Sequence, residues 1–451
     1  MRRHLLVGRF GPGDRAAIPA ADDEVVTRLD LVVSERQLGH GIGRALADLK
    51  ALDLFPSEIG LDLAVLAAHV HAADTRISRN TESQDAWTRE LRLVVPVSDL
   101  ARWNGVVPVL TQALNFLTGD RWTVGFRQRP AKFAKTVPSR APKLVGPPFD
   151  AASLFSGGLD SLIGAIDAFE SGGTPLLVSH AGEGAVSSAQ ELCFEGLKKH
   201  YKSRTVERLR VWMNFPKNLV RDVQSEDSTR GRSFLFFALG VFAGSGFGKD
   251  FVLRAPENGL IALNVPLDTL RLGALSTRTT HPFYIARWNE MLHMLGITGR
   301  IENPYWNKTK GEMVAGCANP GLLRDLIPSS LSCASPTKGR WQGHGTEHCG
   351  FCLPCLIRRA ALAGVDDPTT YTMSNLRAEV WDTTQAKGEQ IRSFQYAIER
   401  LRARPELAKI LIHKPGPLSD NPERNDALAD VYRRGLAEVG ALLSGVRARP
   451  A

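Results

Sequence analysis

The sequence lacks a long apolar run, a secretory leader and a cysteine framework, and each absence narrows the class of protein. The longest nearly uncharged stretch, Phe234 to Gly248, is too short for a membrane helix and contains four glycines. At the amino terminus only three apolar residues follow the basic start before Gly8, so we expect no signal peptide and a cytoplasmic protein. Six cysteines in 451 residues are too few for a secreted disulfide framework.

Basic and acidic residues are nearly balanced along the chain. There are 56 Lys and Arg against 47 Asp and Glu, a formal net charge of +9. Because the two signs are interleaved, the pattern favours a solvated surface over a nucleic-acid face, and a nucleic-acid partner stays open. With 43% apolar and 23% charged residues, the composition is that of a soluble globular protein, and the length predicts two to four domains.

Residues 1–127 show a mixed pattern of short strands and helices. We expect strands at 5–10, 29–33, 90–97 and 122–127, and helices at 38–51, 57–73 and 106–117. This mixture predicts an N-terminal α+β accessory domain. The proline-rich stretch 128–148 predicts a stiff linker or an extended strap.

From residue 149 the pattern becomes strand, loop and helix in repetition. Such alternation up to about residue 365 predicts an α/β domain with a doubly wound parallel sheet and helices on both faces. Residues 366–451 are expected to form a helical C-terminal region, because apolar residues recur there at helical spacing.

The clearest motif is LFSGGLDSLIGA, Leu154 to Ala165, in which a buried strand turns through two glycines into a helix. Glycines let the backbone approach a ligand, and the free N–H groups of a helix start favour an anion. Asp160 would repel a bare phosphate, so it either caps the helix or holds Mg²⁺ beside the phosphates. The pattern favours a nucleotide site over a ligand-free turn. The predicted contacts are Phe155, Ser156, Gly157, Gly158, Leu159, Asp160 and Ser161.

Two arginines, Arg230 and Arg232, stand at the start of the next long helix. A guanidinium can bind phosphate or carboxylate through two hydrogen bonds, but arginines at a helix start are equally common on the surface. Both interpretations stay open from the sequence.

Four cysteines lie close together in the sequence, at Cys333, Cys349, Cys352 and Cys355. Two C-x-x-C steps and a fourth thiolate from a separate loop favour a closed structural zinc site over free thiols or a redox pair. His344 and His348 are alternative ligands in the intervening loop. We expect the zinc loop, 336–348, to hold the substrate side of the nucleotide pocket. Cys193 and Cys317 stand alone and are expected in the core.

The glycine motif, with the four-cysteine knuckle downstream, resembles the QueC family, PP-loop enzymes of the N-type ATP pyrophosphatase superfamily. Further similar segments follow in the same order: Arg232-Ser233, Asn303-Pro304, Thr309-Lys310-Gly311-Glu312, Ser332-Cys333, His348-Cys-Gly-Phe-Cys-Leu-Pro-Cys355 and Arg358. The resemblance covers residues 151–365 and implies an adenine-nucleotide α-hydrolase-like fold with a zinc knuckle. Taken whole, through segments 74–79 and 87–90, the chain resembles the QueC-like component of the Qat anti-phage system, with a CBASS relative as a near neighbour.

The resemblance implies an ATP-dependent, AMP-forming ligase similar to 7-cyano-7-deazaguanine synthase. Such an enzyme adenylates the carboxylate of 7-carboxy-7-deazaguanine, releases pyrophosphate, and forms an amide and then a nitrile. QueC-like defence proteins pass the activated deazaguanine to an amine of a partner protein, so conjugation within a defence operon is expected. The implied cofactors are ATP, Mg²⁺ and Zn²⁺, with Arg232 joining the loop in ATP binding and with catalytic roles for Ser156, Asp160 and Ser161.

Two segments depart from the family pattern, and both belong to the substrate end. Ser179-His-Ala-Gly-Glu183 replaces a Tyr-Gly-Gln-Arg-like segment, and Ser276-Thr-Arg-Thr-Thr-His-Pro282 replaces Gly-Tyr-Pro-Asp-Cys-Arg. The acid and its acceptor therefore stay open. The alternatives are a PP-loop enzyme that thiolates tRNA or DNA, and a non-catalytic ATP-bound scaffold of a defence complex.

Three titratable residues, His180, Glu257 and His281, are expected near the carboxyl ends of strands or in loops, where an α/β pocket opens. We expect them to line or support the pocket and not to act as a general base, because the sequence places no second titratable partner beside them.

Overall fold

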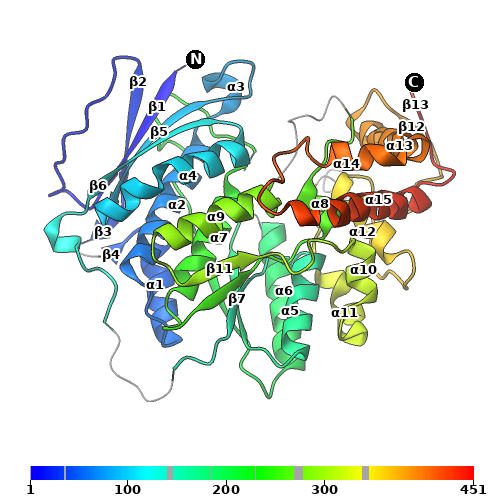
Figure 1. Cartoon of the computed structure of the whole chain (residues 1–451), viewed down its shortest axis with the longest axis horizontal. Helices are drawn as coiled ribbons and strands as arrows, with labels where there is room; N and C mark the ends of the chain where they lie inside the picture. Colours follow the sequence, from blue (N-terminus) through cyan, green and yellow to red (C-terminus); the bar gives the residue numbers. More distant parts are fainter. Residues whose placement is uncertain are drawn as a thin grey trace.

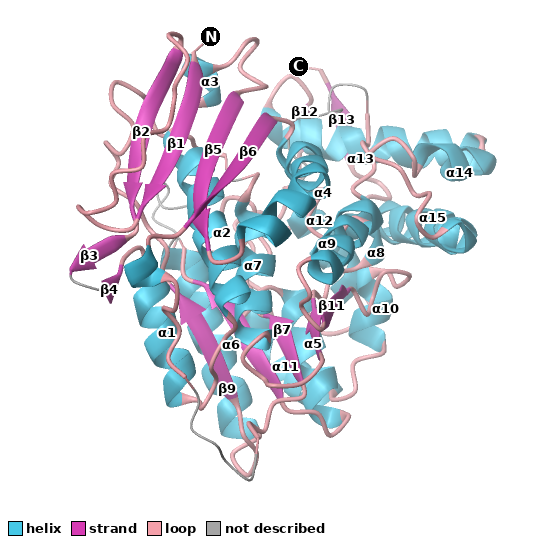
Figure 2. Cartoon of the chain, turned by 60° about the vertical axis from the view of Figure 1, so that its left-hand side comes forward, coloured by secondary structure: helices cyan, strands magenta, loops and turns pink. Residues whose placement is uncertain are grey.

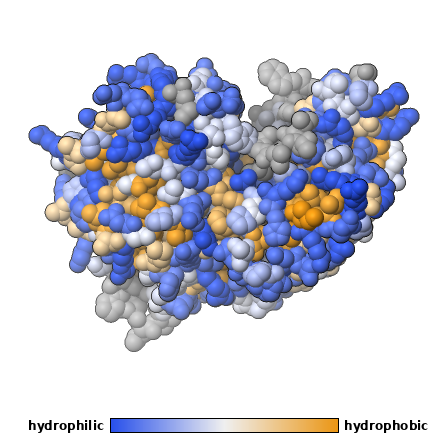
Figure 3. All heavy atoms as spheres, turned by 45° about the horizontal axis from the view of Figure 1, so that its top comes forward, coloured by the Kyte–Doolittle hydropathy of each residue, from blue (hydrophilic) through white to orange (hydrophobic). Residues whose placement is uncertain are grey.

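The computed structural model describes residues 2–34, 37–139, 146–182, 184–228, 230–268, 278–337 and 345–450. These residues form two separate parallel sheets with helices packed on them, followed by a mainly helical region (Figures 1 and 2). Among the described residues, no helix combines the length and apolar character needed to cross a membrane. Figure 3 shows a largely hydrophilic face with apolar patches over both halves.

The first sheet has the strand order β2-β1-β5-β6, and each neighbouring pair is parallel. Its strands are β1 (Arg3–Arg9), β2 (Glu24–Asp30), β5 (Glu90–Val97) and β6 (Arg121–Gln128). A small antiparallel pair, β3 (Val32–Ser34) and β4 (Gln37–Leu38), lies beside it. The helices in this part of the chain are α1 (Ile42–Ala51), α2 (Glu58–Arg76), α3 (Arg79–Glu82) and α4 (Leu100–Thr118).

The prediction of an N-terminal α+β domain is therefore wrong, because the sheet is parallel throughout and the block is of the α/β type. Strands were expected close to β1, β5 and β6, whereas the expected strand 29–33 lies mostly beyond the end of β2. Composition does not give the direction of a strand. Helices α1 to α3 separate β4 from β5, and α4 separates β5 from β6. Such helical crossovers return the chain to the same end of the sheet and make β5 parallel to its neighbours, whereas the crossover from β1 to β2, residues 10–23, contains no helix.

The second sheet has the order β11-β10-β7-β8-β9 and is also parallel throughout, which confirms the predicted α/β class. Its strands are β7 (Ala151–Leu154), β8 (Pro175–His180), β9 (Glu207–Val211), β10 (Phe251–Arg254) and β11 (Gly299–Glu302). The first strand in sequence, β7, is central, and the order reverses between β7 and β10. In open parallel sheets, ligands bind outside the carboxyl ends of the strands at such a reversal.

The helices of this part alternate with these strands along the chain or follow the last of them. They are α5 (Leu159–Glu170), α6 (Gly184–His200), α7 (Arg232–Gly244), α8 (Gly259–Leu263), α9 (Pro282–Met294), α10 (Lys310–Ala315), α11 (Pro320–Leu326), the 3-10 turn η3 (Ile327–Ser329) and α12 (Leu353–Leu362).

The last part of the chain packs its helices against α8 and α12. It contains β12 (Val380–Asp382), α13 (Ala386–Ala403), η5 (Pro405–Leu407), α14 (Ala408–Leu411), η6 (Pro422–Arg424), α15 (Asn425–Leu442) and β13 (Arg447–Arg449). Strands β12 and β13 pair in parallel, so this helical region also holds a small strand pair.

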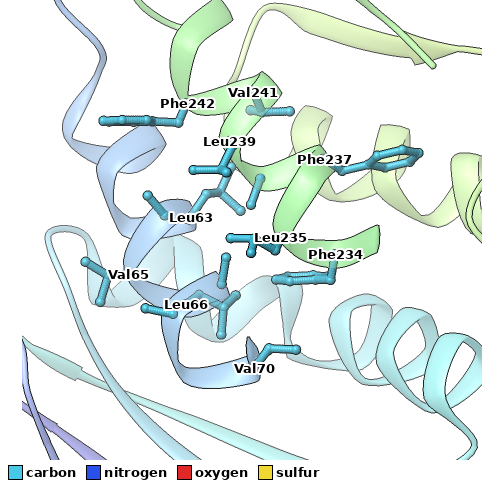
Figure 4. Close-up of a cluster of buried hydrophobic side chains, with 14 of the residues drawn as sticks. Leu63, Val65, Leu66, Val70, Phe234, Leu235, Phe237, Leu239, Val241 and Phe242 are labelled. Atoms are coloured by element: carbon cyan, nitrogen blue, oxygen red, sulfur yellow. The ribbon is translucent and has the colours of Figure 1, made fainter. Parts of the chain in front are cut away.

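Helix α2 joins the two sheets into one core. Ser57 caps it by accepting a hydrogen bond from Gly60 N, and every residue from Gly60 to Thr75 is buried. Leucine and valine side chains of α2 pack against α7, which lies on the second sheet (Figure 4). A single cluster of buried apolar residues therefore includes side chains from both sheets.

The described part of the proline-rich stretch is tied to helix α2. It holds η1 (Ala131–Phe133), and the buried Arg129 pairs with Glu58 at 2.6 Å and also with Asp62. Residues 140–145 of the predicted linker lie outside the described residues.

Candidate functional site

The glycine loop lies at the carboxyl end of the central strand β7 and leads into α5. Gly157 has a φ of +78°, and a Cβ there would lie 2.7 Å from Gln190 N on α6. Gly158 precedes α5 and has no side chain to cap it, and the one first-turn N–H group that a side chain of the described residues accepts, that of Leu159, donates to Ser332 Oγ at 3.3 Å. The loop is thus closely packed behind, and the first turn of α5 keeps the N–H groups that attract an anion.

The hydroxyls of the loop lie together at its rim. Ser156 Oγ and Ser161 Oγ are 3.2 Å apart, and Ser161 Oγ also accepts a hydrogen bond from Ser156 N at 3.2 Å. Ser161 in turn donates to Gly158 O at 2.9 Å. The predicted loop residues therefore form one connected turn with two hydroxyls on the same side.

Asp160 is held by residues from two other segments. Its carboxylate accepts hydrogen bonds from Asn258 N at 3.1 Å and Asn258 Nδ2 at 2.7 Å, and it pairs with Lys310 Nζ at 2.6 Å. The carboxylate is therefore held by Asn258 and Lys310, and not by the N–H groups at the start of α5. Magnesium at Asp160 would have to replace the lysine, so the geometry does not favour that expectation.

Two cavities, of about 320 and 280 Å³, lie on either side of the loop. They are bordered in common by Ser156, Ser161, Pro256, Glu257 and Leu331. The larger extends to Arg232 and Phe236, and we call it the α7 cavity. The smaller extends to Lys310, Ser332 and Cys333, and we call it the cysteine-side cavity. Volumes near 300 Å³ and above are typical of small-molecule sites.

The two arginines considered from the sequence have different places. Arg232 lines the α7 cavity, with its guanidinium 5.3 Å from the Phe236 ring centroid. Arg230 lies on Trp87 of the N-terminal part, 3.7 Å from the ring, and donates to Thr118 O at 3.3 Å. Its burial lowers its pKa to about 10. Only Arg232 of the pair borders a described cavity beside the loop.

Segments 74–79 and 87–90 supply a buried group of charges behind α7. Arg89 donates to Asp120 at 2.6 Å and to Asp74 at 3.2 Å, and Arg79 donates to Asp120 at 2.6 Å. Asp74 also accepts a hydrogen bond from Gly231 N at 2.8 Å. This last contact fixes the backbone next to Arg232, so the N-terminal part helps to form the wall of the α7 cavity.

Glu257 borders both cavities. It follows β10, and Thr280 donates a hydrogen bond to its Oε2. Loss of solvation, together with the charge of Asp160, raises the pKa of Glu257 to about 7. No partner for this residue could be recognised from the sequence, because Thr280 and Asp160 come from distant segments.

The two histidines are structural, as predicted. His180 Nε2 lies 3.4 Å from Met213 O, and burial lowers its pKa to about 4. His281 Nδ1 accepts a hydrogen bond from Phe283 N at 3.2 Å and so caps α9, and burial lowers its pKa to about 3.

The predicted cysteine cluster is confirmed. The sulfur atoms of Cys333, Cys349, Cys352 and Cys355 all lie within 4.8 Å of one another and could hold a metal ion such as zinc. Cys352 N donates to Cys349 Sγ at 3.3 Å, and Cys349 N donates to Cys333 Sγ at 3.4 Å. Hydrogen bonds from its thiol neighbours, Cys333 first, hold the pKa of Cys349 below its ordinary value. The backbone N–H groups of Cys349 and Cys352, which donate to sulfur atoms of the cluster, also favour the thiolate form that a metal binds.

The predictions for the remaining cysteines and histidines have different outcomes. Cys193 and Cys317 are buried, as expected, and burial raises the pKa of each to about 12. His348 is not in the cluster; its Nε2 accepts a hydrogen bond from Ser332 N at 3.1 Å. His344 and most of the intervening loop, residues 338–344, lie outside the described residues, as do Glu183, Ser276 and Thr277 of the departing segments.

The segment 330–333 connects the cysteine cluster with the glycine loop. Leu331 N donates to Gly157 O at 2.9 Å, and Ser332 Oγ accepts from Leu159 N at 3.3 Å. The buried Arg358 donates to Ser330 Oγ at 2.9 Å and supports the segment from α12. The predicted link between zinc site and pocket therefore lies in this segment among the described residues, just before the loop that the sequence suggested.

Sequence reasoning did not assign roles to Asn258, Lys310 or Ser332. Lys310 and Ser332 belong to short motifs that matched the family, and that match was the available signal. Nothing near Asn258 in the sequence indicates its contact with Asp160.

No family model matches this chain, and no curated protein matches it.

Proposed function

We propose that this protein is an AMP-forming ligase of the QueC-like PP-loop type, which uses ATP to activate a carboxylate and transfers the acyl group to an amine. The observation that carries the proposal is the glycine loop at the reversal of strand order, with a cavity on each side. One loop between two cavities suits a reaction in which two ligands must meet.

The loop would bind the β- and γ-phosphates and leave the α-phosphorus accessible to the acid. The first turn of α5 and the hydroxyl of Ser156 supply donors for the pyrophosphate that departs, and the Ser161 hydroxyl would join them by turning away from Gly158 O. Arg232 offers a guanidinium to a phosphate or carboxylate in the α7 cavity. Attack of the carboxylate on phosphorus forms the acyl adenylate and breaks the bond to pyrophosphate.

The substrate class rests on the family resemblance. It points to a 7-carboxy-7-deazaguanine-type acid, an amide or nitrile product, and conjugation to a partner protein in anti-phage defence. Mg²⁺ would accompany ATP and neutralise phosphate charge, while Asp160 is paired with Lys310. Zinc would have a structural role, because four cysteines complete a tetrahedral site without an open position.

One observation favours a second candidate, thiolation of a nucleic acid. Cys333 borders the cysteine-side cavity, so a sulfur atom lies beside the proposed nucleotide site. That sulfur is also part of the four-cysteine cluster, where a bound metal would occupy it. The ligase is therefore the better supported of the two functions.

The test is product analysis after mixing the protein with Mg-ATP and 7-carboxy-7-deazaguanine. We expect AMP and pyrophosphate only when the acid is present. Ser161→Ala should lower this rate by about tenfold or more, because one donor to the phosphates is lost. Ser171→Ala, at the exposed other end of α5, is the matched control and should leave it unchanged. ADP and phosphate as products would contradict the proposal.

A further inference from the structure

The side chain of Glu257 lies where the two cavities meet. It belongs to the short set of residues that border both, together with the hydroxyls of the glycine loop. An activated acid in one cavity and an amine entering from the other would therefore both face this carboxyl group. No other titratable side chain among the described residues borders both cavities.

The position of Glu257 is fixed on two sides. Asn303 Nδ2 donates to Glu257 O at 2.7 Å, and Glu257 N donates to Asn303 Oδ1 at 3.3 Å, so the amide of Asn303 clamps the backbone. Thr280 donates to Oε2 of the side chain. The described structure shows no hydrogen bond to Oε1, and this oxygen can accept a proton from a ligand.

Three charged groups from separate helices line the cavities that Glu257 borders, and two of them, Asp160 and Lys310, act on its carboxyl group. Asp160 comes from α5, Lys310 from α10 and Arg232 from α7. Burial and the carboxylate of Asp160 raise the pKa of Glu257 to about 7, while Lys310 and the hydrogen bond from Thr280 oppose this shift. A carboxyl group with such a pKa exchanges protons at neutral pH, which is the property of an effective general base.

We propose that Glu257 is the general base of the amide-forming step. The inference rests on the proposed ligase function and assigns a role within it. The amine nitrogen attacks the acyl carbon of the adenylate, and the bond between that carbon and the phosphate oxygen breaks. AMP leaves with the electron pair, and the nitrogen passes its proton to Oε1 of Glu257. The first half-reaction, adenylate formation, needs no such base because the acid is already ionised.

The experiment separates the two half-reactions in the full chain with Glu257→Gln. Pyrophosphate exchange into ATP, dependent on 7-carboxy-7-deazaguanine, reports adenylation, and we expect it to stay within about threefold of the unmodified protein. Amide formation with ammonium ions should fall by roughly 10²–10⁴, the usual contribution of a general base. Hydroxylamine is a stronger nucleophile that depends less on a base to remove the proton of the attacking nitrogen, and it should restore part of the acyl transfer in the variant.

Glu302→Gln is the matched control. Glu302 ends the neighbouring strand β11 and borders neither of the two cavities, so all three rates should be unchanged. At equal pH and ammonium concentration, the ratio of the amide-forming rate of the unmodified protein to that of Glu257→Gln should rise with pH up to about 7 and then level off.

Two results would overturn the inference while leaving the ligase proposal intact: an unchanged ammonium rate in Glu257→Gln, or an equal loss of exchange, ammonium and hydroxylamine rates. Absence of acid-dependent exchange in the unmodified protein is a different result. It would overturn the proposed function, and the inference with it.

Discussion

Gly157 shows how a single residue sets the shape of the glycine loop. Its φ of +78° lies in the left-handed region, and the backbone of α6 leaves no room for a Cβ. Gly172, just beyond the other end of α5, has a similar φ of +88°, but a Cβ there would meet nothing within 4 Å. Comparing an alanine substitution at the two positions therefore separates the cost of a left-handed backbone from the cost of a steric clash.

We expect Gly172→Ala to cost about 1–2 kcal/mol of stability, the usual penalty of a left-handed alanine. Gly157→Ala should cost more and should also weaken binding of an ATP analogue by at least tenfold, because the loop must move away from α6. Urea denaturation and calorimetric titration measure the two effects. Equal nucleotide affinity in both variants would contradict this account of the loop.

At this scale the sequence predicted the local part of the site and missed the distant part. The turn from Phe155 to Ser161 is contiguous, so its glycines and hydroxyls could be recognised from a short pattern. Asp160 instead pairs with Lys310, 150 residues away, and the role of Glu257 depends on Thr280 and Asp160. Such contacts depend on how the strands are ordered, which a single sequence does not specify.

Among the elements, the segment 330–333 is the one that transmits order from the cysteine cluster to the loop. It carries Cys333 at one end and contacts Gly157 and Leu159 through Leu331 and Ser332. Its hydrogen bond to His348 adds a second connection to the cysteine-bearing part. The proposed nucleotide site and the metal site that the four cysteines could form are therefore expected to depend on each other.

Cys355→Ala should lose the bound metal and bind an ATP analogue several-fold more weakly. Ser332→Ala should keep the metal and still lose about 3- to 10-fold in nucleotide affinity, the value of one hydrogen bond. Cys193→Ala, a buried cysteine outside the cluster, should alter neither property. Metal analysis and calorimetry give both quantities. Full nucleotide affinity in a metal-free Cys355→Ala protein would disprove the connection.

Across the whole molecule, several histidines are buried in the neutral form. Burial lowers the pKa of His69 and His180 to about 4 and that of His71 and His281 to about 3. An unfolded histidine has a pKa of about 6.5, so below that pH the unfolded chain binds more protons than the native one. Each of these groups therefore reduces stability as the pH falls from 6.5 toward the native pKa.

His281→Asn isolates one such contribution, because asparagine can also cap α9. Between pH 7.5 and 5.5 the unmodified protein should lose about 1.4 kcal/mol more unfolding free energy than the variant, because the unfolded histidine takes up its proton over that interval and the native one does not. Urea denaturation at the two pH values measures the difference. A difference between the two proteins that does not change with pH would show that His281 is not neutral in the native state.

The packing of α2 on α7 has a consequence for how the chain is made. Ribosomes synthesise α2 long before α7, and the apolar residues of α7 that cover it come only after the glycine loop and strands β8 and β9 have been made. Until then the nascent chain exposes a leucine- and valine-rich helix, a surface that chaperones bind and that aggregates. The N-terminal part is thus expected to reach its final state last, although it is synthesised first.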